Sequence, residues 1–339
     1  MFCLAMMYEG ATGETRQAIA DVLEISGLDH EDRQTAIVRL KSALQMCDRD
    51  VQLLIGNSLW CNRDIPVRPD YLARMSKDYG AQVESLDFSD AASVSRINAW
   101  VEENTRGKID GIIDHISALD LLIAINAIYF KGLWTRPFDR NATRDDSFTT
   151  GNGLEKKLPM MRQFGRFRYS ENHAFQAVVL PYQGNRIAMY VFLPTRRSTL
   201  REFEQNLNSA EWEQRMRDFK PVLGAIRLPR FAVSYQTQLN GPLSDLGMAM
   251  AFDPRRARFD GISPSPPQIW IGQALHRALA EVNEEGTEAA AVTAMTATLS
   301  MAQRPEHTFE MIVNRPFFFV IRDDQTGTIL FMGAVNDPE

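Results

Sequence analysis

A strand–turn–strand pattern in the middle of the chain constrains its fold more than any other feature. Residues 175–182 and 186–193 are rich in β-branched, aromatic and other apolar side chains, and only Gln183, Gly184 and Asn185 separate them. Two such runs around a short glycine-containing turn predict an antiparallel β-hairpin. The chain is therefore expected to build part of its core from paired strands.

The end of the chain carries a second hairpin pattern. Residues 317–321 and 329–332 are strongly apolar, and a polar turn at residues 323–327 lies between them. Because polar residues do not alternate with apolar ones in either run, we expect this hairpin to be buried. Other segments with strand-like composition are residues 51–60, 225–235 and 268–283.

Apolar residues at helical spacing fall mostly before these strands. They predict helices over residues 1–10, 13–26, 32–47, 93–106 and 200–219. Helices thus come first, and strands and helices then mix without the regular alternation of a parallel α/β fold. This order predicts the α+β class with a largely antiparallel sheet. Because neither an internal repeat nor a long linker divides the chain, we expect a single domain over residues 1–339.

Composition and charge argue against several classes of partner. The chain has 339 residues, of which 45% are hydrophobic and 24% charged, which is usual for a globular protein with a substantial core. Its formal net charge of −6 favours neither nucleic acid nor an anionic membrane. No run reaches the roughly 20 apolar residues of a membrane-spanning helix. We therefore expect no nucleic-acid partner and no membrane partner.

Sequence motifs for metal, cofactor or catalytic sites are absent. Cys3, Cys47 and Cys61 have no CxxC spacing, and the five histidines are scattered without metal-ligand spacing. No nucleotide-binding or hydrolase motif occurs either. We expect no cofactor, no metal and no enzymatic activity. His276 lies in an apolar strand pattern, which favours a hydrogen-bonded core residue over an acid or base.

A run of small residues near the end of the chain is unsuited to a core. Residues 284–300 read EEGTEAAAVTAMTATLS, which offers too little apolar bulk to anchor the segment. As a strand, one face would carry small or uncharged side chains, beginning with Thr287, Ala289 and Ala291, and Glu288 would be the one interior charge on the other. Such a strand could enter between two existing strands without steric obstruction. A flexible loop without a task is the alternative.

Five segments of the sequence resemble the serpin family, in the order in which serpins carry them. They are residues 126–139, 180–194, 228–253, 276–294 and 314–338. The resemblance implies the serpin fold, in which helices pack on a large central mixed β-sheet beside further β-sheets and an exposed reactive-centre loop. That loop would lie at about residues 284–305.

The function implied by this resemblance is inhibition of serine proteases, with cysteine proteases as a further target class. The protease would attack the loop of a monomeric inhibitor and form a covalent acyl complex. The cleaved loop would then enter the main sheet as a new strand before water can hydrolyse the complex. The alternatives are a non-inhibitory serpin-fold protein with a binding or structural role, and an inactive truncated serpin.

The resemblance also assigns residues to the hinge of the loop and to its reactive bond. The hinge comprises Glu284, Glu285, Gly286, Thr287, Glu288, Ala289, Ala290 and Ala291. Small hinge residues are typical of inhibitory serpins and therefore favour inhibition. Counting the fifteen residues from Gly286 to Ser300 places the reactive bond between Ser300 and Met301. Leu299, Met301 and Arg304 stay open for the position before the bond, so the target protease is not fixed.

Three residues outside the loop match serpin positions beneath the point where the sheet opens. Asn126 and His276 match a buried polar pair, and Trp134 matches the tryptophan under the hinge. The resemblance implies that these residues hold a closed sheet that can still part. Ordinary core packing is the alternative for each of them.

The beginning of the sequence departs from the serpin pattern. Serpins start with a helix and a strand that precede the helix ending here at Gly10, and we find no counterpart of either. We therefore expect an incomplete N-terminus, from which any targeting signal would also be missing. The compartment is not assigned, although an extracellular or periplasmic location is favoured.

Overall fold

The residues that the structure describes form two compact units. The computed structural model describes residues 1–45, 51–264, 268–287 and 308–338. The first unit comprises residues 1–46, 53–130 and 233–279, and the second comprises residues 47–52, 131–232 and 280–339. The boundaries fall inside strands β3 (Leu122–Leu133) and β10 (Ile271–Val282), so each of these strands contributes to both units.

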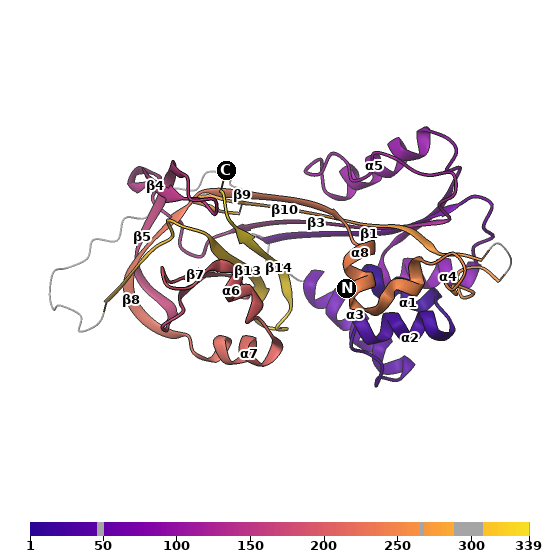
Figure 1. Ribbon diagram of the computed structural model, residues 1–339, viewed down its shortest axis with the longest axis horizontal. Coiled ribbons are helices and arrows are strands. Elements are labelled where there is room, and N and C mark those ends of the chain that lie inside the picture. The colour runs from indigo at the N-terminus through magenta and orange to yellow at the C-terminus, as the bar shows by residue number, and fades with distance from the viewer. Residues whose placement is uncertain (46–50, 265–267, 288–307, 339) are drawn as a thin grey trace. The chain divides into compact units, whose positions relative to one another are not determined.

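The first unit consists of helices on both faces of a group of strands (Figure 1). Its helices are α1 (Phe2–Gly10), α2 (Gly13–Val22), α3 (His30–Gln45), α4 (Pro69–Arg74), α5 (Ala92–Asn104) and α8 (Asn240–Leu243). Short helical turns are η1 (Met75–Tyr79), η3 (Ser244–Met248) and η4 (Ala249–Phe252). Its strands are β1 (Val51–Asn62), β2 (Gln82–Leu86), most of β9 (Phe231–Gln238), and the longer parts of β3 and β10.

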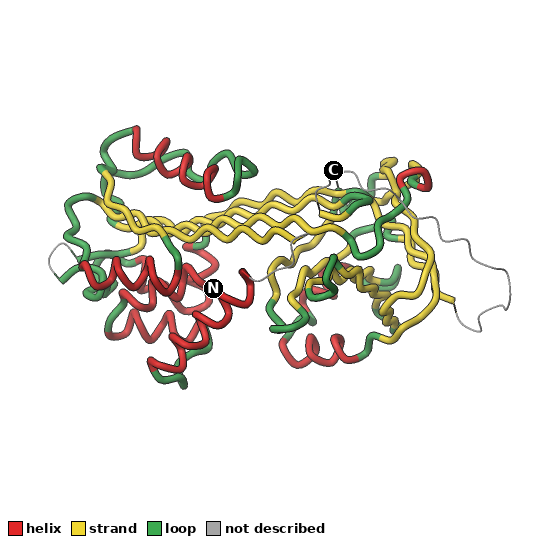
Figure 2. Tube along the Cα trace, turned by 180° about the vertical axis from the view of Figure 1, so that it is seen from behind, coloured by secondary structure: helices red, strands yellow, loops and turns green. Residues whose placement is uncertain are grey.

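Strand β3 shows why these strands must be apolar on both faces. Leu122 and Ala124 belong to the core that they share with helices α1 and α2, whereas Ile123 and Ile125 belong to the core that contains Trp100 of α5. Successive side chains of a strand point to opposite faces, so a strand covered on both sides needs a continuous apolar run. Figures 1 and 2 show α5 on one side of the strands and α1, α2 and α3 on the other.

The strands of the first sheet follow the order β2-β1-β3-β11-β10-β9. Strands β1 and β2 pair in parallel, from Ser58↔Gln82 to Asn62↔Leu86. Strand β11 (Gly286–Thr287) has only two residues and is antiparallel to both of its neighbours, β3 and β10. Strands β3 and β10 also pair directly with each other. We call this direct pairing the β3–β10 seam.

The second unit is built on an eight-stranded sheet with the order β12-β8-β5-β6-β7-β13-β14, in which β4 also pairs with β5. Its strands are β4 (Arg144–Thr149), β5 (Glu155–Glu171), β6 (Phe175–Pro181), β7 (Ile187–Pro194), β8 (Lys220–Pro229), β12 (Thr308–Ile312), β13 (Phe317–Asp323) and β14 (Ile329–Val335). The unit also contains the short helix η2 (Arg140–Ala142).

Both hairpins predicted from the sequence are confirmed. Strands β6 and β7 pair from Phe175↔Pro194 to Pro181↔Ala188, and β13 pairs with β14 as well as with β7. The β6–β7 turn places Gly184 at φ 78° and Asn185 at φ 57°, which are the conformations that favour these two residue types. The α+β class is confirmed too, although the sheets are mixed because β1–β2 and β8–β12 pair in parallel.

The single helix predicted over residues 200–219 is wrong, because the structure has two helices there. Helix α6 (Leu200–Gln205) ends before Asn206, and α7 (Ser209–Arg217) begins after Asn208. Asn208 has an extended backbone, and its side chain accepts a hydrogen bond from the backbone N–H of Glu211. An asparagine that caps a new helix in this way interrupts the preceding one.

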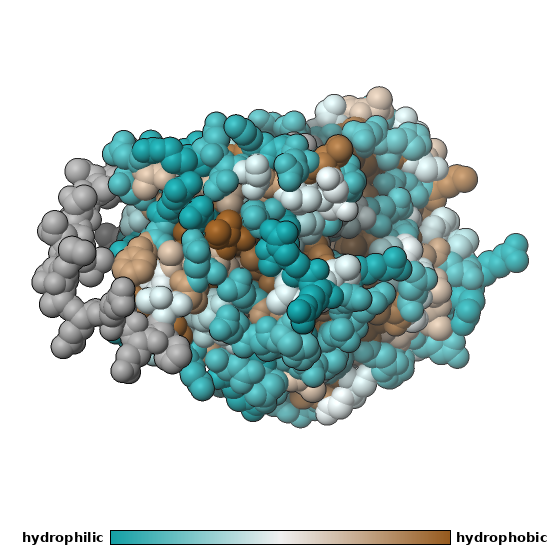
Figure 3. All heavy atoms as spheres, turned by 60° about the vertical axis from the view of Figure 1, so that its left-hand side comes forward, coloured by the Kyte–Doolittle hydropathy of each residue, from teal (hydrophilic) through white to brown (hydrophobic). Residues whose placement is uncertain are grey.

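The surface, the cysteines and the hydropathy of the helices complete the description of the fold. The face shown in Figure 3 is mostly hydrophilic, and its apolar side chains gather in small patches. Cys3 and Cys61 are free thiols, and burial raises the pKa of each to about 12, whereas Cys47 lies outside the described residues. Among the described residues, no helix has both the length and the hydropathy needed to cross a membrane.

We expect Phe309→Ala to destabilise the second unit by about 3 kcal/mol, the usual cost of removing a buried phenylalanine ring. Phe309 is 8% exposed, its ring stacks on Tyr169 at a centroid distance of 3.9 Å, and it covers Gly224 of β8. Denaturant unfolding measures the loss. Phe164→Ala, at a residue on β5 that is 42% exposed, is the control and should change stability far less. Equal effects of the two variants would contradict this packing.

Candidate functional site

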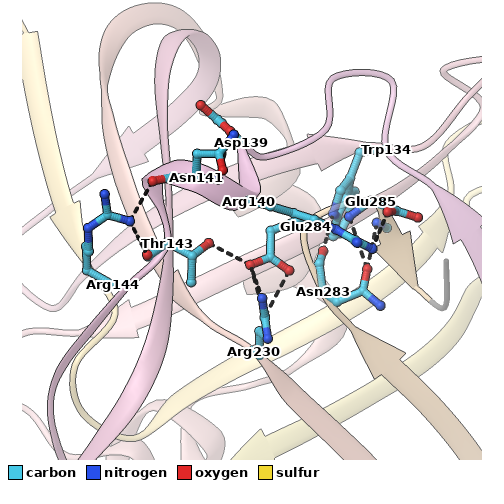
Figure 4. A network of polar contacts seen from close by, with 11 residues as sticks. Trp134, Asp139, Arg140, Asn141, Thr143, Arg144, Arg230, Asn283, Glu284 and Glu285 are labelled. Carbon is cyan, nitrogen blue, oxygen red and sulfur yellow. Dashed lines mark hydrogen bonds and ion pairs between the residues drawn. The ribbon is translucent and has the colours of Figure 1, made fainter. Parts of the chain in front are cut away.

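A tight turn after β10 carries the first residues of the predicted loop back into the sheet. The backbone N–H of Asn283 donates to the carbonyl of Gly286, and the Asn283 side-chain oxygen accepts from the N–H groups of Glu285 and Gly286. Thr287 then pairs with Val282 of β10. We refer to residues 283–286 as the hinge turn, and its contacts are shown in Figure 4.

Gly286 is required where β11 meets β3. It lies opposite Leu133, and its φ of 153° is a value that residues with side chains rarely adopt. A Cβ at this position would collide with the carbonyl oxygen of Gly132 and would lie 2.7 Å from the Cα of Leu133. The close approach of the two backbones therefore depends on glycine at position 286.

Thr287 is completely enclosed. Its side chain has no exposed surface, and its hydroxyl lies 2.8 Å from the hydroxyl of Tyr182. Burial raises the pKa of Tyr182 well above its usual range, so this hydroxyl keeps its proton and the pair can share a hydrogen bond. The second residue of β11 is thus held by backbone pairing on both sides and by a side-chain contact.

Trp134 lies under the hinge turn and holds it by two hydrogen bonds. Its indole N–H donates to the carbonyl of Asn283 at 2.9 Å, and its backbone N–H donates to the carbonyl of Glu285 at 2.8 Å. The ring is 1% exposed and stacks on Tyr182 at a centroid distance of 4.5 Å. The structure therefore places Trp134 in direct contact with the hinge turn, as the sequence resemblance predicts.

Glu284 makes the strongest polar contacts of the hinge turn. The side chain is 2% exposed, and both carboxylate oxygens accept from the Arg230 guanidinium at 2.6 to 2.9 Å. The Thr143 hydroxyl donates to Oε1 at 2.6 Å. Burial alone would raise the pKa of Glu284, but these donors outweigh it and the pKa lies below its usual range. Glu284 is therefore a buried, fully paired anion.

The remaining contacts of the hinge turn are weaker. The side chain of Glu285 is nearly buried and forms an ion pair with Arg140, whose own side chain is mostly exposed. The second carboxylate oxygen of Glu285 has no partner among the described residues. The backbone N–H of Phe138 donates to the carbonyl of Glu284 at 2.7 Å. The turn is thus tied to the segment that follows β3 by backbone as well as side-chain bonds.

A second polar cluster lies in the first unit and bridges the β3–β10 seam. Nδ1 of His276 on β10 lies 2.8 Å from Oδ1 of Asn126 on β3, and Nδ2 of Asn126 donates to Oδ1 of Asn57 on β1 at 2.8 Å. Burial lowers the pKa of His276 below its ordinary value, although the bond to Asn126 opposes this shift. The neutral imidazole therefore joins a chain of hydrogen bonds across three strands.

The structure describes only some of the predicted site residues, and it places these in two clusters. Glu284, Glu285, Gly286 and Thr287 lie together beside Trp134, and Asn126 contacts His276 in a separate cluster. The predicted hinge residues Glu288, Ala289, Ala290 and Ala291, and the predicted reactive bond between Ser300 and Met301, lie outside the described residues. Their assignments stay predictions.

Five contact residues were not predicted from the sequence. They are Asn57, Arg140, Thr143, Tyr182 and Arg230. Each is a common surface or core residue type, and none lies near its partner in the sequence. Arg230 stands between the apolar residues of two strands, and a charged residue at such a place was the one available signal of an ion pair.

The arrangement holds the end of a strand. Among the described residues, no group of three His, Cys, Asp or Glu side chains could bind a metal ion. The two carboxylates of the hinge turn pair with arginines outside it, Glu284 with Arg230 and Glu285 with Arg140. Chemically, the site can fix the hinge turn at the end of the seam.

Comparisons with known proteins point to one family. A family model described as Serpin (serine protease inhibitor) matches residues 1–338. An uncharacterised serpin-like protein of Thermococcus kodakarensis is 35% identical over 339 residues, which cover 99% of this chain and 78% of that protein.

Solved structures agree with this match. Tengpin, a thermophilic serpin in its native state, superposes with a TM-score of 0.91 at 29% identity, over 99% of this chain and 86% of tengpin. Human thyroxine-binding globulin in complex with thyroxine superposes with a TM-score of 0.87 at 25% identity, over 99% of this chain and 89% of the globulin.

Removal of Arg230 should lower the stability of the fold because it leaves the buried Glu284 carboxylate without its ion-pair partner. We expect Arg230→Ala to lower the free energy of unfolding by about 1 to 2 kcal/mol, less than for a fully buried pair, because Glu284 is 2% exposed but Arg230 is 44% exposed and water can partly replace it. The double variant Arg230→Ala/Glu284→Gln should recover part of that loss, because no buried charge is left unpaired. Denaturant unfolding of the three proteins tests this, and strictly additive effects would show that the pair is not coupled.

His276 should make stability fall in mildly acidic solution. Its pKa in the folded chain lies below the unfolded value of about 6.5, so folding favours the neutral imidazole. The stabilisation is complete above that pH and is lost as the pH falls towards the folded-state pKa. Melting temperatures between pH 8 and pH 5 should fall less steeply for His276→Gln than for the wild type. The exposed His115→Gln is the control, and an unchanged slope in His276→Gln would refute the assignment.

Proposed function

The chain belongs to the serpin family and has the serpin fold, and from this premise we propose that it inhibits serine proteases by cleavage-triggered loop insertion. The reactive-centre loop would span about residues 284–305, with the reactive bond between Ser300 and Met301. The protease would form an acyl intermediate at this bond, and the cleaved loop would lengthen β11 between β3 and β10. Cysteine proteases are a further target class in this proposal.

The observation that carries this proposal is the state of β11. Its two residues are buried and paired with β3 on one side and β10 on the other, while the same two strands pair directly at the seam. Because β11 is antiparallel to both neighbours, β3 and β10 run parallel to each other, and a strand continuing from Thr287 would run back along the seam. Each residue it added would find backbone partners on both sides.

Lengths support the same proposal. Strands β3 and β10 have 12 residues each, which at about 3.3 Å per residue gives a track of about 40 Å. The 15 residues from Gly286 to Ser300 would extend over about 50 Å as a strand. The loop is therefore long enough to fill the whole track before it reaches the reactive bond.

Insertion would have to replace the backbone pairing of the seam and the side-chain hydrogen bond that crosses it. The Asn126–His276 hydrogen bond joins β3 to β10, and both residues lie about midway along their strands. An entering strand must separate these side chains, whereas the hinge turn can stay bound to Trp134 and Arg230. We propose that Asn126 and His276 hold the closed sheet and that Trp134 fixes the point from which it opens.

The two compact units would act as one functional domain over residues 1–339. Strands β3 and β10 pass from one unit into the other, so the proposed insertion would involve strands of both. We propose a monomer, because a single chain supplies both the loop and the sheet that receives it.

A non-inhibitory role is the second candidate. The structural similarity to thyroxine-binding globulin, whose structure contains thyroxine, shows that a chain of this fold can serve as a ligand-binding protein. An inactive truncated serpin is the third candidate. Neither of these alternatives requires a covalent complex with a protease, and this difference separates them from inhibition.

The test is the formation of a complex that survives denaturing electrophoresis. We expect the 38.4 kDa chain, mixed with trypsin-like, chymotrypsin-like and elastase-like proteases, to give a band of summed mass with at least one of them. Thr287→Arg should abolish this band and leave a cleaved chain, because an arginine cannot occupy the enclosed position of Thr287.

Thr326→Arg, at an exposed turn residue, is the matched control and should keep the band. Cleavage of the wild type without a complex by every protease would favour the non-inhibitory alternatives. A band that persists in Thr287→Arg would contradict the role of the hinge. Independently, the cleaved wild type should melt at a higher temperature than the intact chain, because the inserted strand adds backbone hydrogen bonds.

A further inference from the structure

A pocket of about 340 Å³ opens in the second unit beside the hinge turn. Its walls come from the segment that follows β3, from the middle of β5, and from strands β6 and β7. This volume is at the lower end of the range for small-molecule pockets. Serpin loop insertion as proposed above does not use this pocket, so its lining calls for a separate explanation.

The inner part of the pocket is apolar. Its buried lining residues are Trp134, Phe138, Phe167, Val179, Leu180 and Ala188. Three of these are aromatic, and none of the others carries a polar side chain. An occupant with a flat, apolar body would therefore remove mostly apolar surface from water on both sides of the contact.

The rim of the pocket carries an excess of positive charge. Arg136, Arg166 and Arg168 line it, against a single carboxylate, Asp324. Arg168 already bonds Asp324 at 2.9 Å, and the Tyr190 hydroxyl donates to the same carboxylate at 2.6 Å. Arg136 and Arg166 are exposed and form no ion pair within the described part of the chain. Two guanidinium groups are therefore available to pair with an anion.

Arg136 is positioned by the strand beneath it. The Gln163 side-chain amide donates to the carbonyls of Arg136 and Pro137 at 2.8 and 3.1 Å, which ties this segment to β5. A Cβ at position 165 would collide with the Arg136 guanidinium, so that group lies directly against the backbone of Gly165. The absence of a side chain at Gly165 leaves the space that the Arg136 guanidinium occupies beside β5.

We propose that this pocket binds a small amphipathic anion, a carboxylate or sulfonate attached to an aromatic or other compact apolar body. The acidic group would bond to Arg136 and Arg166, and the body would pack on the apolar lining. An inorganic anion would leave the apolar surface unused, and a neutral ligand would leave the two guanidinium groups unused. This inference does not depend on protease inhibition.

The occupant would also touch residues that hold the hinge turn. Trp134 and Phe138 both line the pocket, and their backbone N–H groups donate to the carbonyls of Glu285 and Glu284. A ligand packed against these two rings would therefore restrain the segment that anchors β11. The pocket is a place where a metabolite-sized anion can contact Trp134 and Phe138, which hold the hinge turn.

The test compares a charged and a neutral probe of the same shape. We expect 1-naphthaleneacetate to bind the full chain with a sub-millimolar Kd in isothermal titration calorimetry, and 1-naphthaleneacetamide to bind about tenfold more weakly. In the double variant Arg136→Gln/Arg166→Gln, binding of the acid should weaken about tenfold and approach that of the amide. Both arginines are exposed, so these substitutions leave the core intact.

Arg162→Gln supplies the matched control. Arg162 lies on the same strand but pairs with Asp146 outside the pocket, so its loss should leave binding of the acid unchanged. The inference is overturned if the wild type does not bind the acid, if acid and amide bind equally, or if Arg162→Gln weakens binding as much as the double variant does.

Discussion

The structure depends on the β3–β10 seam. The two long strands pair directly there, and the two-residue strand β11 lies between them at one end. At one end of β3 and β10, the two residues of β11 satisfy the backbone groups of both neighbours. At the seam, β3 and β10 satisfy each other. Both arrangements leave few backbone groups unpaired, so the same sheet can accept either without a large penalty at its edges. In the proposed mechanism, the two polar clusters would set where one arrangement gives way to the other.

The two polar clusters have different physical characters. The hinge turn is held by a buried carboxylate with a bidentate arginine partner, a bond that is costly to break because either group alone would be an unpaired charge. The Asn126–His276 contact joins neutral groups, and a bond of that kind contributes about 1 kcal/mol net. The side-chain contact that anchors β11 is therefore stronger than the side-chain contact that crosses the seam. In the proposed mechanism, the sheet would open at the seam while the hinge turn stays bound.

Much of the fold could be predicted from the sequence, because its strands and helices have clear patterns. The β6–β7 and β13–β14 hairpins follow from two apolar runs around short turns, which is information local to each segment. The break between α6 and α7 was missed although Asn208 was visible, because the capping role of an asparagine depends on a backbone conformation that composition does not show.

The partners of the site residues could not be predicted in the same way. Arg230 and Thr143 lie 54 and 141 positions from Glu284, and Tyr182 lies 105 positions from Thr287. Only the assembled sheets bring these residues together. Trp134, Asn126 and His276 were identified through resemblance to a family, and their contacts became visible only in three dimensions.

The fixed length of the hinge turn has a consequence for how such chains can vary. Thr287 faces Tyr182 because four residues separate the end of β10 from it, and alternate residues of a strand face the same side. Deleting one residue between Val282 and Thr287 would bring the acidic side chain of Glu288 to the position of the threonine, and inserting one would bring the residue that precedes Thr287 there. The number of residues between Val282 and Thr287 should therefore be kept in the lineage of this protein.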